Sequence, residues 1–269
     1  MLTMFKRLAS LIPTPATNKV TLFVSDTGIP SYKDDAGLVT PMSGQPIPTG
    51  YIDGLKMEWV SGTQIRFTSG SAYIPSLGRA LALAAAVTKT PTLAANTWYH
   101  NYVYDNAGTT DVEVSTTVPA APYNGTARTK TGDTSRRYIG SFRTDASGAI
   151  LNFQQEGGRI IYQGFLNQAP FTVLSNGSST TETTVSLTAV VPPTARVGML
   201  RHTNGSTATS SRMNNSSAVF PNYVMNFGTG ADAFIDFVVN ANQSVSYWCG
   251  GAPSPSGVYI QVLGYVLER

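Results

Sequence analysis

Residues 98–115 read Trp98-Tyr-His-Asn-Tyr-Val-Tyr-Asp-Asn-Ala-Gly-Thr-Thr-Asp-Val-Glu-Val-Ser115. Two runs rich in aromatic and β-branched residues flank Asn106-Ala107-Gly108, and such residues favour strands while Asn and Gly favour chain reversals. The stretch therefore predicts two antiparallel strands joined by a tight turn.

The same pattern continues outward from this hairpin over residues 51–162. Gly62, Ser69-Gly70 and Asp145-Ala146-Ser147-Gly148 mark further reversals. Residues 79–87 fit either a helix or a strand, and the alternation of Leu81 and Leu83 favours the strand. Short strands at this spacing predict an antiparallel sandwich or barrel. The expected strands are 55–60, 64–68, 71–74, 98–104, 112–115, 137–143, 150–153 and 159–162.

A second antiparallel β domain is predicted from residue 165 to residue 269. Its final strand is apolar on both faces, so we expect it to lie centrally in a sheet or at a subunit interface. The polar stretches 175–181 and 204–217 are expected to be exposed loops, which often carry function. The expected strands are 171–174, 183–187, 198–202, 223–227, 233–239, 244–248 and 259–267.

The first fifty residues predict an anchoring segment made of a short helix and a β-hairpin. Runs at 19–25, 29–32 and 38–40 indicate the hairpin or a three-stranded meander. A Pro- and Gly-rich stretch at 41–50 marks the boundary, giving domains 1–50, 51–164 and 165–269. An apolar stripe at helical spacing predicts a helix over 2–12, which either packs on its own domain or docks on sister copies or on another protein. The stripe consists of Leu2, Phe5, Leu8, Leu11 and Ile12.

The composition indicates a subunit that assembles. Hydrophobic residues make up 42% of the chain and charged residues 12%, whereas ordinary soluble domains carry about 25% charged residues. A surface of neutral polar groups provides little repulsion between copies. The net charge of +3 is scattered, so no nucleic-acid partner is expected. No apolar run is long enough to predict membrane insertion.

The sequence assigns no catalytic residue, metal site or cofactor. The single Cys249 excludes an intrachain disulfide and the common zinc spacings. His100 reads as a strand side chain, and His202 is either structural or a ligand contact at the edge of a polar loop. Asp232 and Asp236 could converge with Glu182, but no recognisable motif supports a reaction there.

The C-terminal domain carries a candidate glycan site. Amide groups match the hydroxyl groups of sugars, and flat aromatic rings cover the apolar sugar face. The alternative is that the rings belong to the core and the amides to a solvated loop. The candidate residues are Asn214, Asn215, Asn222, Tyr223, Tyr247 and Trp248.

Several segments resemble the tail-fibre and virion appendage proteins of tailed bacteriophages. The opening strand 19–25, the turn Asp26-Thr27-Gly28 and the run 32–37 look like the virion-anchoring hairpin of such proteins. The runs 98–105, 112–117 and 130–142 are similar to a β module of phage fibre and tail proteins. The likeness covers residues 19–162 and reaches the C-terminal domain only in style.

This resemblance implies a homotrimeric structural protein, assembled in the host cytoplasm and located on the virion, on the tail rather than the head. Its N-terminus would bind other virion proteins of the tail, baseplate or capsid, and its C-terminal domain would contact a host surface glycan as receptor. Two alternatives stay open: a capsid decoration or head-fibre protein, and an appendage enzyme that degrades polysaccharide.

Overall fold

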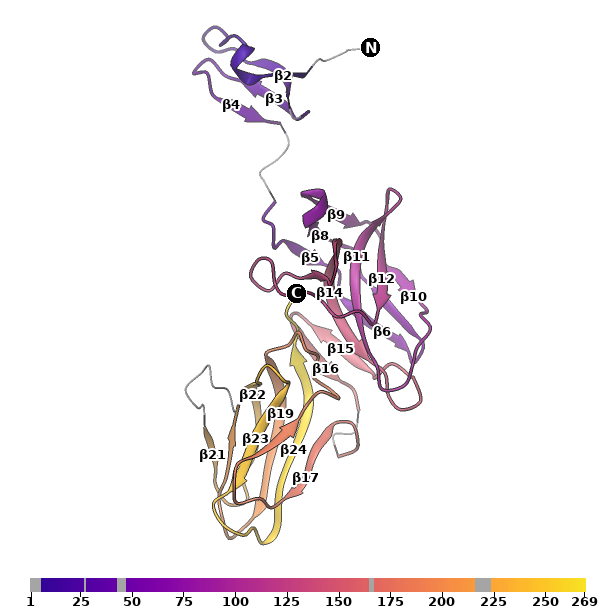
Figure 1. The fold of residues 1–269 in the computed structure, drawn as a ribbon, viewed down its shortest axis with the longest axis vertical. Helices are drawn as coiled ribbons and strands as arrows, with labels where there is room; N and C mark the ends of the chain where they lie inside the picture. Colours follow the sequence, from indigo (N-terminus) through magenta and orange to yellow (C-terminus); the bar gives the residue numbers. More distant parts are fainter. Residues whose placement is uncertain (1–5, 27, 43–46, 165–166, 216–223) are drawn as a thin grey trace. The chain divides into compact units, whose positions relative to one another are not determined.

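The computed structural model describes residues 6–26, 28–42, 47–164, 167–215 and 224–269 (Figure 1). These residues form an all-β protein, and none of them belongs to a helix of seven or more residues. Two short 3-10 turns, η1 (Ala9–Leu11) and η2 (Pro75–Leu77), are the helical elements described. The chain divides into two compact units, Met1–Ile47 and Pro48–Arg269.

The first unit is one small sheet in which β2 and β3 form a hairpin. The hairpin is extended by β4 on one side and by the parallel strand β1 on the other. The Asp34 carboxylate accepts hydrogen bonds from the amides of Ala36 (3.1 Å) and Leu38 (2.7 Å) and so holds the turn before β4. The strands are β1 (Lys6–Arg7), β2 (Thr21–Ser25), β3 (Pro30–Lys33) and β4 (Val39–Pro41).

The helix predicted over residues 2–12 is wrong for the part that the structure describes. Lys6 and Arg7 pair in parallel with Val24 and Ser25 of β2, and η1 follows them. A helix this short is marginal in water. The edge of β2 has unpaired backbone N–H and C=O groups with which an extended segment can form hydrogen bonds. Of the predicted stripe, Ile12 is buried while Leu8 and Leu11 are exposed. Leu2 and Phe5 lie outside the described residues.

The hairpin predicted from residues 98–115 is confirmed as β11 (Trp98–Asn106) and β12 (Thr109–Ser115). Ala107 and Gly108 both have positive φ angles, 50° and 91°, as a type I′ turn requires. β11 also pairs with β14 (Asp133–Arg143), which carries β13 (Thr129–Lys130) at the edge.

Two three-stranded sheets pack near this four-stranded sheet. One has the order β10-β7-β6 and the other β5-β8-β9. Residues 79–87 supply β9 and the start of β10, so the strand favoured over the helix is confirmed. The strands are β5 (Ile52–Gly54), β6 (Met57–Ser61), β7 (Gln64–Phe67), β8 (Gly70–Ile74), β9 (Arg79–Leu83) and β10 (Val87–Lys89).

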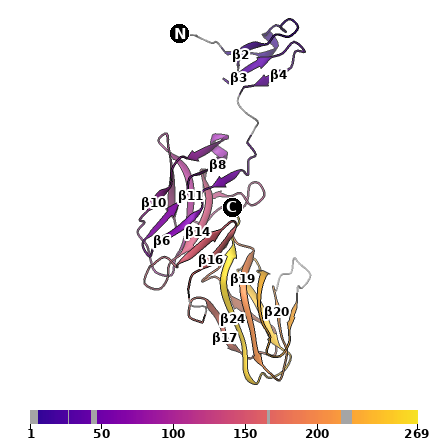
Figure 2. The same ribbon diagram turned by 180° about the vertical axis from the view of Figure 1, so that it is seen from behind.

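The remaining strands form a six-stranded and a four-stranded sheet (Figures 1 and 2). Their inner faces meet where His202 stacks on Phe227, with ring centroids 3.8 Å apart. The larger sheet contains β15 (Phe153–Glu156), β16 (Arg159–Tyr162), β17 (Thr172–Gly177), β19 (Val197–Ser206), β22 (Asp232–Val238) and β24 (Pro255–Val266). The smaller contains β18 (Thr183–Ser186), β20 (Ser211–Asn214), β21 (Met225–Phe227) and β23 (Ser244–Cys249).

The long strand β24 is central, as its apolar pattern predicts. It pairs with β19 along one edge and with β17 and β16 along the other. Gly264 lies where β24 passes β16, and a Cβ there would stand 1.9 Å from the Ile160 carbonyl oxygen. The close pairing of the two strands therefore depends on a residue without a side chain.

Buried polar contacts join the β11–β14 sheet to the C-terminal strands. Ser141 Oγ lies 2.7 Å from His100 Nδ1 and 2.8 Å from the Tyr138 hydroxyl, which reaches Thr194 Oγ1 at 2.9 Å. The Tyr265 hydroxyl donates to the Ser141 carbonyl oxygen at 2.7 Å. The boundary expected at residue 164 thus falls within one continuous core.

Candidate functional site

Among its described residues, the first unit exposes more large hydrophobic side chains than it buries. Its buried hydrophobic side chains among the described residues are Ile12 and Phe23. Leu22, on β2 beside Phe23, is 58% exposed, because successive strand residues face opposite sides of the sheet. We call the exposed set the attachment surface: Leu8, Leu11, Val20, Leu22, Ile29, Leu38, Met42 and Ile47.

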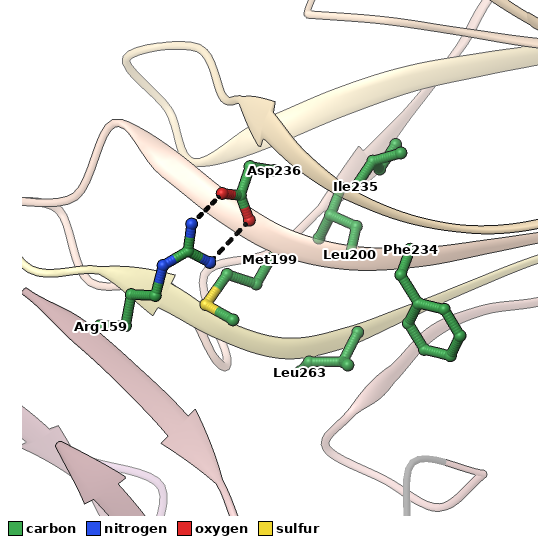
Figure 3. Close-up of a pocket in the computed structure, with 7 residues that line it drawn as sticks. All are labelled: Arg159, Met199, Leu200, Phe234, Ile235, Asp236 and Leu263. Atoms are coloured by element: carbon green, nitrogen blue, oxygen red, sulfur yellow. Dashed lines mark hydrogen bonds and ion pairs between the residues drawn. The ribbon is translucent and has the colours of Figure 1, made fainter. Parts of the chain in front are cut away.

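A second feature is a hollow of about 400 Å³ on the outer face of the six-stranded sheet. Figure 3 shows an aromatic ring, an ion pair and a floor of aliphatic side chains around it. We call it the sheet hollow. Its lining residues are Arg159, Met199, Leu200, Phe234, Ile235, Asp236 and Leu263.

A forked ion pair closes one side of the sheet hollow (Figure 3). The two terminal nitrogens of Arg159, on β16, donate to the two oxygens of Asp236, on β22, at 3.2 and 2.5 Å. Both side chains stay partly exposed, at 47% and 43%. The groups therefore hold each other in a fixed orientation and still face solvent.

A second arginine–aspartate pair lies on the same face of the sheet, four residues before Asp236 on β22. Arg201 donates to both oxygens of Asp232 at 2.9 and 2.6 Å, and the Thr203 hydroxyl adds a third bond at 3.0 Å. The hydrogen bonds from Arg201 lower the pKa of the Asp232 carboxyl below its usual value. This aspartate is consequently an anion across the physiological pH range.

Phe234 lies between the two aspartates on β22. Residues 232, 234 and 236 share one face because side chains alternate along a strand. The Phe234 ring is 64% exposed, and the Arg201 guanidinium stands over it at 5.6 Å from the ring centroid. The outer face of the sheet thus presents the exposed aromatic ring of Phe234 between two arginine–aspartate ion pairs.

The residues expected to bind glycan do not form one exposed surface. Asn214 and Asn215 are 2% exposed and Tyr247 is 4% exposed. Tyr247 and Trp248 are consecutive on β23 and face opposite sides; the ring of Trp248 lies beside Arg212, at 5.8 Å. The remaining candidates, Asn222 and Tyr223, lie outside the described residues.

The candidate acid and base residues are not gathered either. Burial lowers the pKa of both His100 and His202 to about 4. Glu182 accepts from Asn214 on the smaller sheet, at 3.3 Å, whereas Asp232 and Asp236 lie on the larger one. Among the described residues, no three His, Cys, Asp or Glu side chains are grouped to hold a metal ion.

The chain matches no family model, and no curated protein matches it. In the described part of the chain, no helix is long and apolar enough to cross a membrane.

Sequence reasoning missed the sheet hollow. The alternation Asp232-x-Phe234-x-Asp236 signals that these three side chains share a face. Nothing in the sequence shows that Arg159, in a strand 77 residues away, pairs with Asp236. The partner is set by how β16 and β22 are placed in the sheet.

Proposed function

We propose that the chain is a non-enzymatic structural subunit of a tailed-phage virion appendage. The first unit fastens it to another virion protein, and residues 48–269 carry a contact for a host surface glycan. The observation that carries the proposal is the attachment surface. The resemblance of residues 19–162 to phage fibre proteins is the reason for proposing a phage particle.

We expect a partner to cover the attachment surface. A sheet of short strands that buries two hydrophobic side chains among its described residues provides little stabilisation for its own folding. Covering exposed apolar side chains with a partner removes apolar area from water, which favours association. Covering them with sister copies and a virion protein would supply the missing burial, which fits a homotrimer fixed to the particle.

The placement of the ionisable groups favours binding over hydrolysis. A glycosidase needs two carboxyl groups on either side of the scissile bond, one of them with a raised pKa. Asp236 and Asp232 are each held by a forked arginine, and the pKa of Asp232 is lowered. Carboxylates paired in this way act as hydrogen-bond acceptors of fixed orientation rather than as proton donors.

The test is to locate the protein on phage particles. Gold-labelled antibody against the chain is applied to particles carrying the wild-type protein or Leu22→Asp Leu38→Asp. The proposal expects label on the tail with the wild type and loss of label with the variant. Label confined to the head would favour a decoration protein, and unlabelled wild-type particles would contradict a virion role.

A hydrolytic role is tested with the same purified protein. We expect no new reducing ends after incubation with host polysaccharide. Reducing ends that appear with the wild type and disappear with Asp236→Ala would overturn the non-enzymatic proposal.

A further inference from the structure

We infer that the sheet hollow binds one neutral hexopyranose unit of a polysaccharide, with Phe234 against its C–H face and the Arg159–Asp236 pair on its hydroxyl groups. The inference deepens the proposed function, on which it rests for the source of the glycan. It places the sugar on β22 and β16, away from Asn214 and Asn215 at the end of β20.

The Arg159–Asp236 pair supplies matched polar groups in a fixed geometry. Each oxygen of Asp236 accepts one hydrogen bond from Arg159 and keeps acceptor capacity, while the guanidinium keeps further N–H donors. Neighbouring hydroxyl groups of a pyranose can donate to the carboxylate and accept from the guanidinium. The fork is already formed, so little side-chain entropy is lost on binding.

Phe234 and the floor of the sheet hollow supply the apolar contact. The ring is 64% exposed and lies two residues from Asp236 on the same strand face. Met199 and Leu263 line the space beside them (Figure 3). A pyranose has one face of C–H groups and a rim of hydroxyls, so it matches an aromatic ring with polar groups beside it.

Charge and desolvation favour a neutral sugar over other occupants. Asp232 and Asp236 each pair with an arginine on the same face, so the charges of Arg159 and Arg201 are already balanced and favour no acidic ligand. An apolar protein surface would desolvate both ion pairs without replacing their water contacts. Sugar hydroxyls replace those contacts.

The Met199 methyl group reports occupancy of the sheet hollow. The full chain is labelled with ¹³C at its methionine methyls and titrated with maltohexaose, cellohexaose, mannohexaose and galactohexaose as probes. We expect a saturable shift of the Met199 signal with at least one probe. The Met213 signal should stay fixed, because this residue is 0% exposed in the core.

Variants assign the contacts. Phe234→Ala should abolish saturation, and Asp236→Asn should weaken binding about tenfold, as expected for one lost charge-assisted hydrogen bond. Val238→Ala is the matched control, since Val238 is exposed on the same strand but does not line the hollow. Both test residues are surface groups, and an unchanged Met213 signal verifies that each variant is folded.

Three outcomes overturn the inference. They are no shift with any of the four probes, a shift that persists in Phe234→Ala, and a Met199 signal that changes only with protein concentration, which would assign the hollow to a second copy. The result is separable from particle labelling. Labelled tails without a sugar shift leave the appendage role intact, whereas a sugar shift with unlabelled particles retains the hollow and removes the phage role.

Discussion

The Tyr265 hydroxyl donates a hydrogen bond of 2.7 Å to the carbonyl oxygen of Ser141, a residue 124 positions earlier in the chain. Both groups are buried, and the bond joins β24 to β14. The two halves of the second unit therefore share a polar contact within their common core, and they should unfold together.

Removing this hydroxyl should destabilise the whole second unit. Tyr265→Phe keeps the ring but leaves the Ser141 carbonyl without its donor, which costs about 1–3 kcal/mol for a buried group. Urea unfolding followed by fluorescence measures the change. Tyr259→Phe, on the same strand but partly exposed, should cost less than about 0.5 kcal/mol. Two separate transitions in the wild type would contradict the shared core.

Adding a methyl group at Gly264 should open the pairing of β24 with β16. The new Cβ would meet the Ile160 carbonyl oxygen at 1.9 Å, so the backbones must move apart. We expect Gly264→Ala to lower the free energy of unfolding by about 1–3 kcal/mol. Gly228→Ala is the control, because a Cβ there has no neighbour within 4 Å. Equal stability of the two variants would contradict the claim that the pairing of β24 with β16 requires glycine at position 264.

Stability should fall as the pH drops from about 6.5 to about 4. Burial lowers the pKa of His100 and His202 from 6.5 to about 4 in the folded chain, so the unfolded chain binds protons first. Each histidine then costs about 1.4 kcal/mol per pH unit within this window and nothing above it. Urea midpoints at pH 7 and pH 4.5 measure the loss. His202→Gln should remove about half of this slope; an unchanged slope would mean that His202 is protonated in the folded chain.

Exposed leucines of the first unit should determine self-association. Leu22 and Leu38 are 58% and 64% exposed and belong to the first unit, so Leu22→Asp Leu38→Asp should leave the second unit folded and weaken self-association at least about tenfold. Val118→Asp is the control, because Val118 is 50% exposed in the second unit. Sedimentation measures the assembly state. A wild-type chain that stays monomeric at 28.6 kDa would contradict the homotrimer.

Local sequence patterns predicted the parts of the fold whose cause is local. Asn106-Ala107-Gly108 specifies its own turn, and the two-sided apolar pattern of β24 specifies a central strand. The predicted N-terminal helix is wrong because the spacing of Leu8 and Leu11 contains no information about β2. The edge of that strand pairs with Lys6 and Arg7. Helical periodicity in so short a segment is a weak constraint.

The candidate site was harder to predict, since polar composition does not give exposure. Asn214 and Asn215 have the residue type of a sugar-binding loop, yet both are buried. The exposed ring of Phe234 lies in an apolar run that reads as core. Long-range strand order decides which of these side chains reaches solvent.

The central place of β24 sets an order of events during synthesis. The ribosome makes β16, β17 and β19 earlier, so each emerges while the strand that will lie between them is still missing. Until it arrives, the edges of β16, β17 and β19 that pair with β24 lack that partner and could pair with another chain. A polypeptide can therefore complete its own sheet only after Pro255–Val266 has left the ribosome.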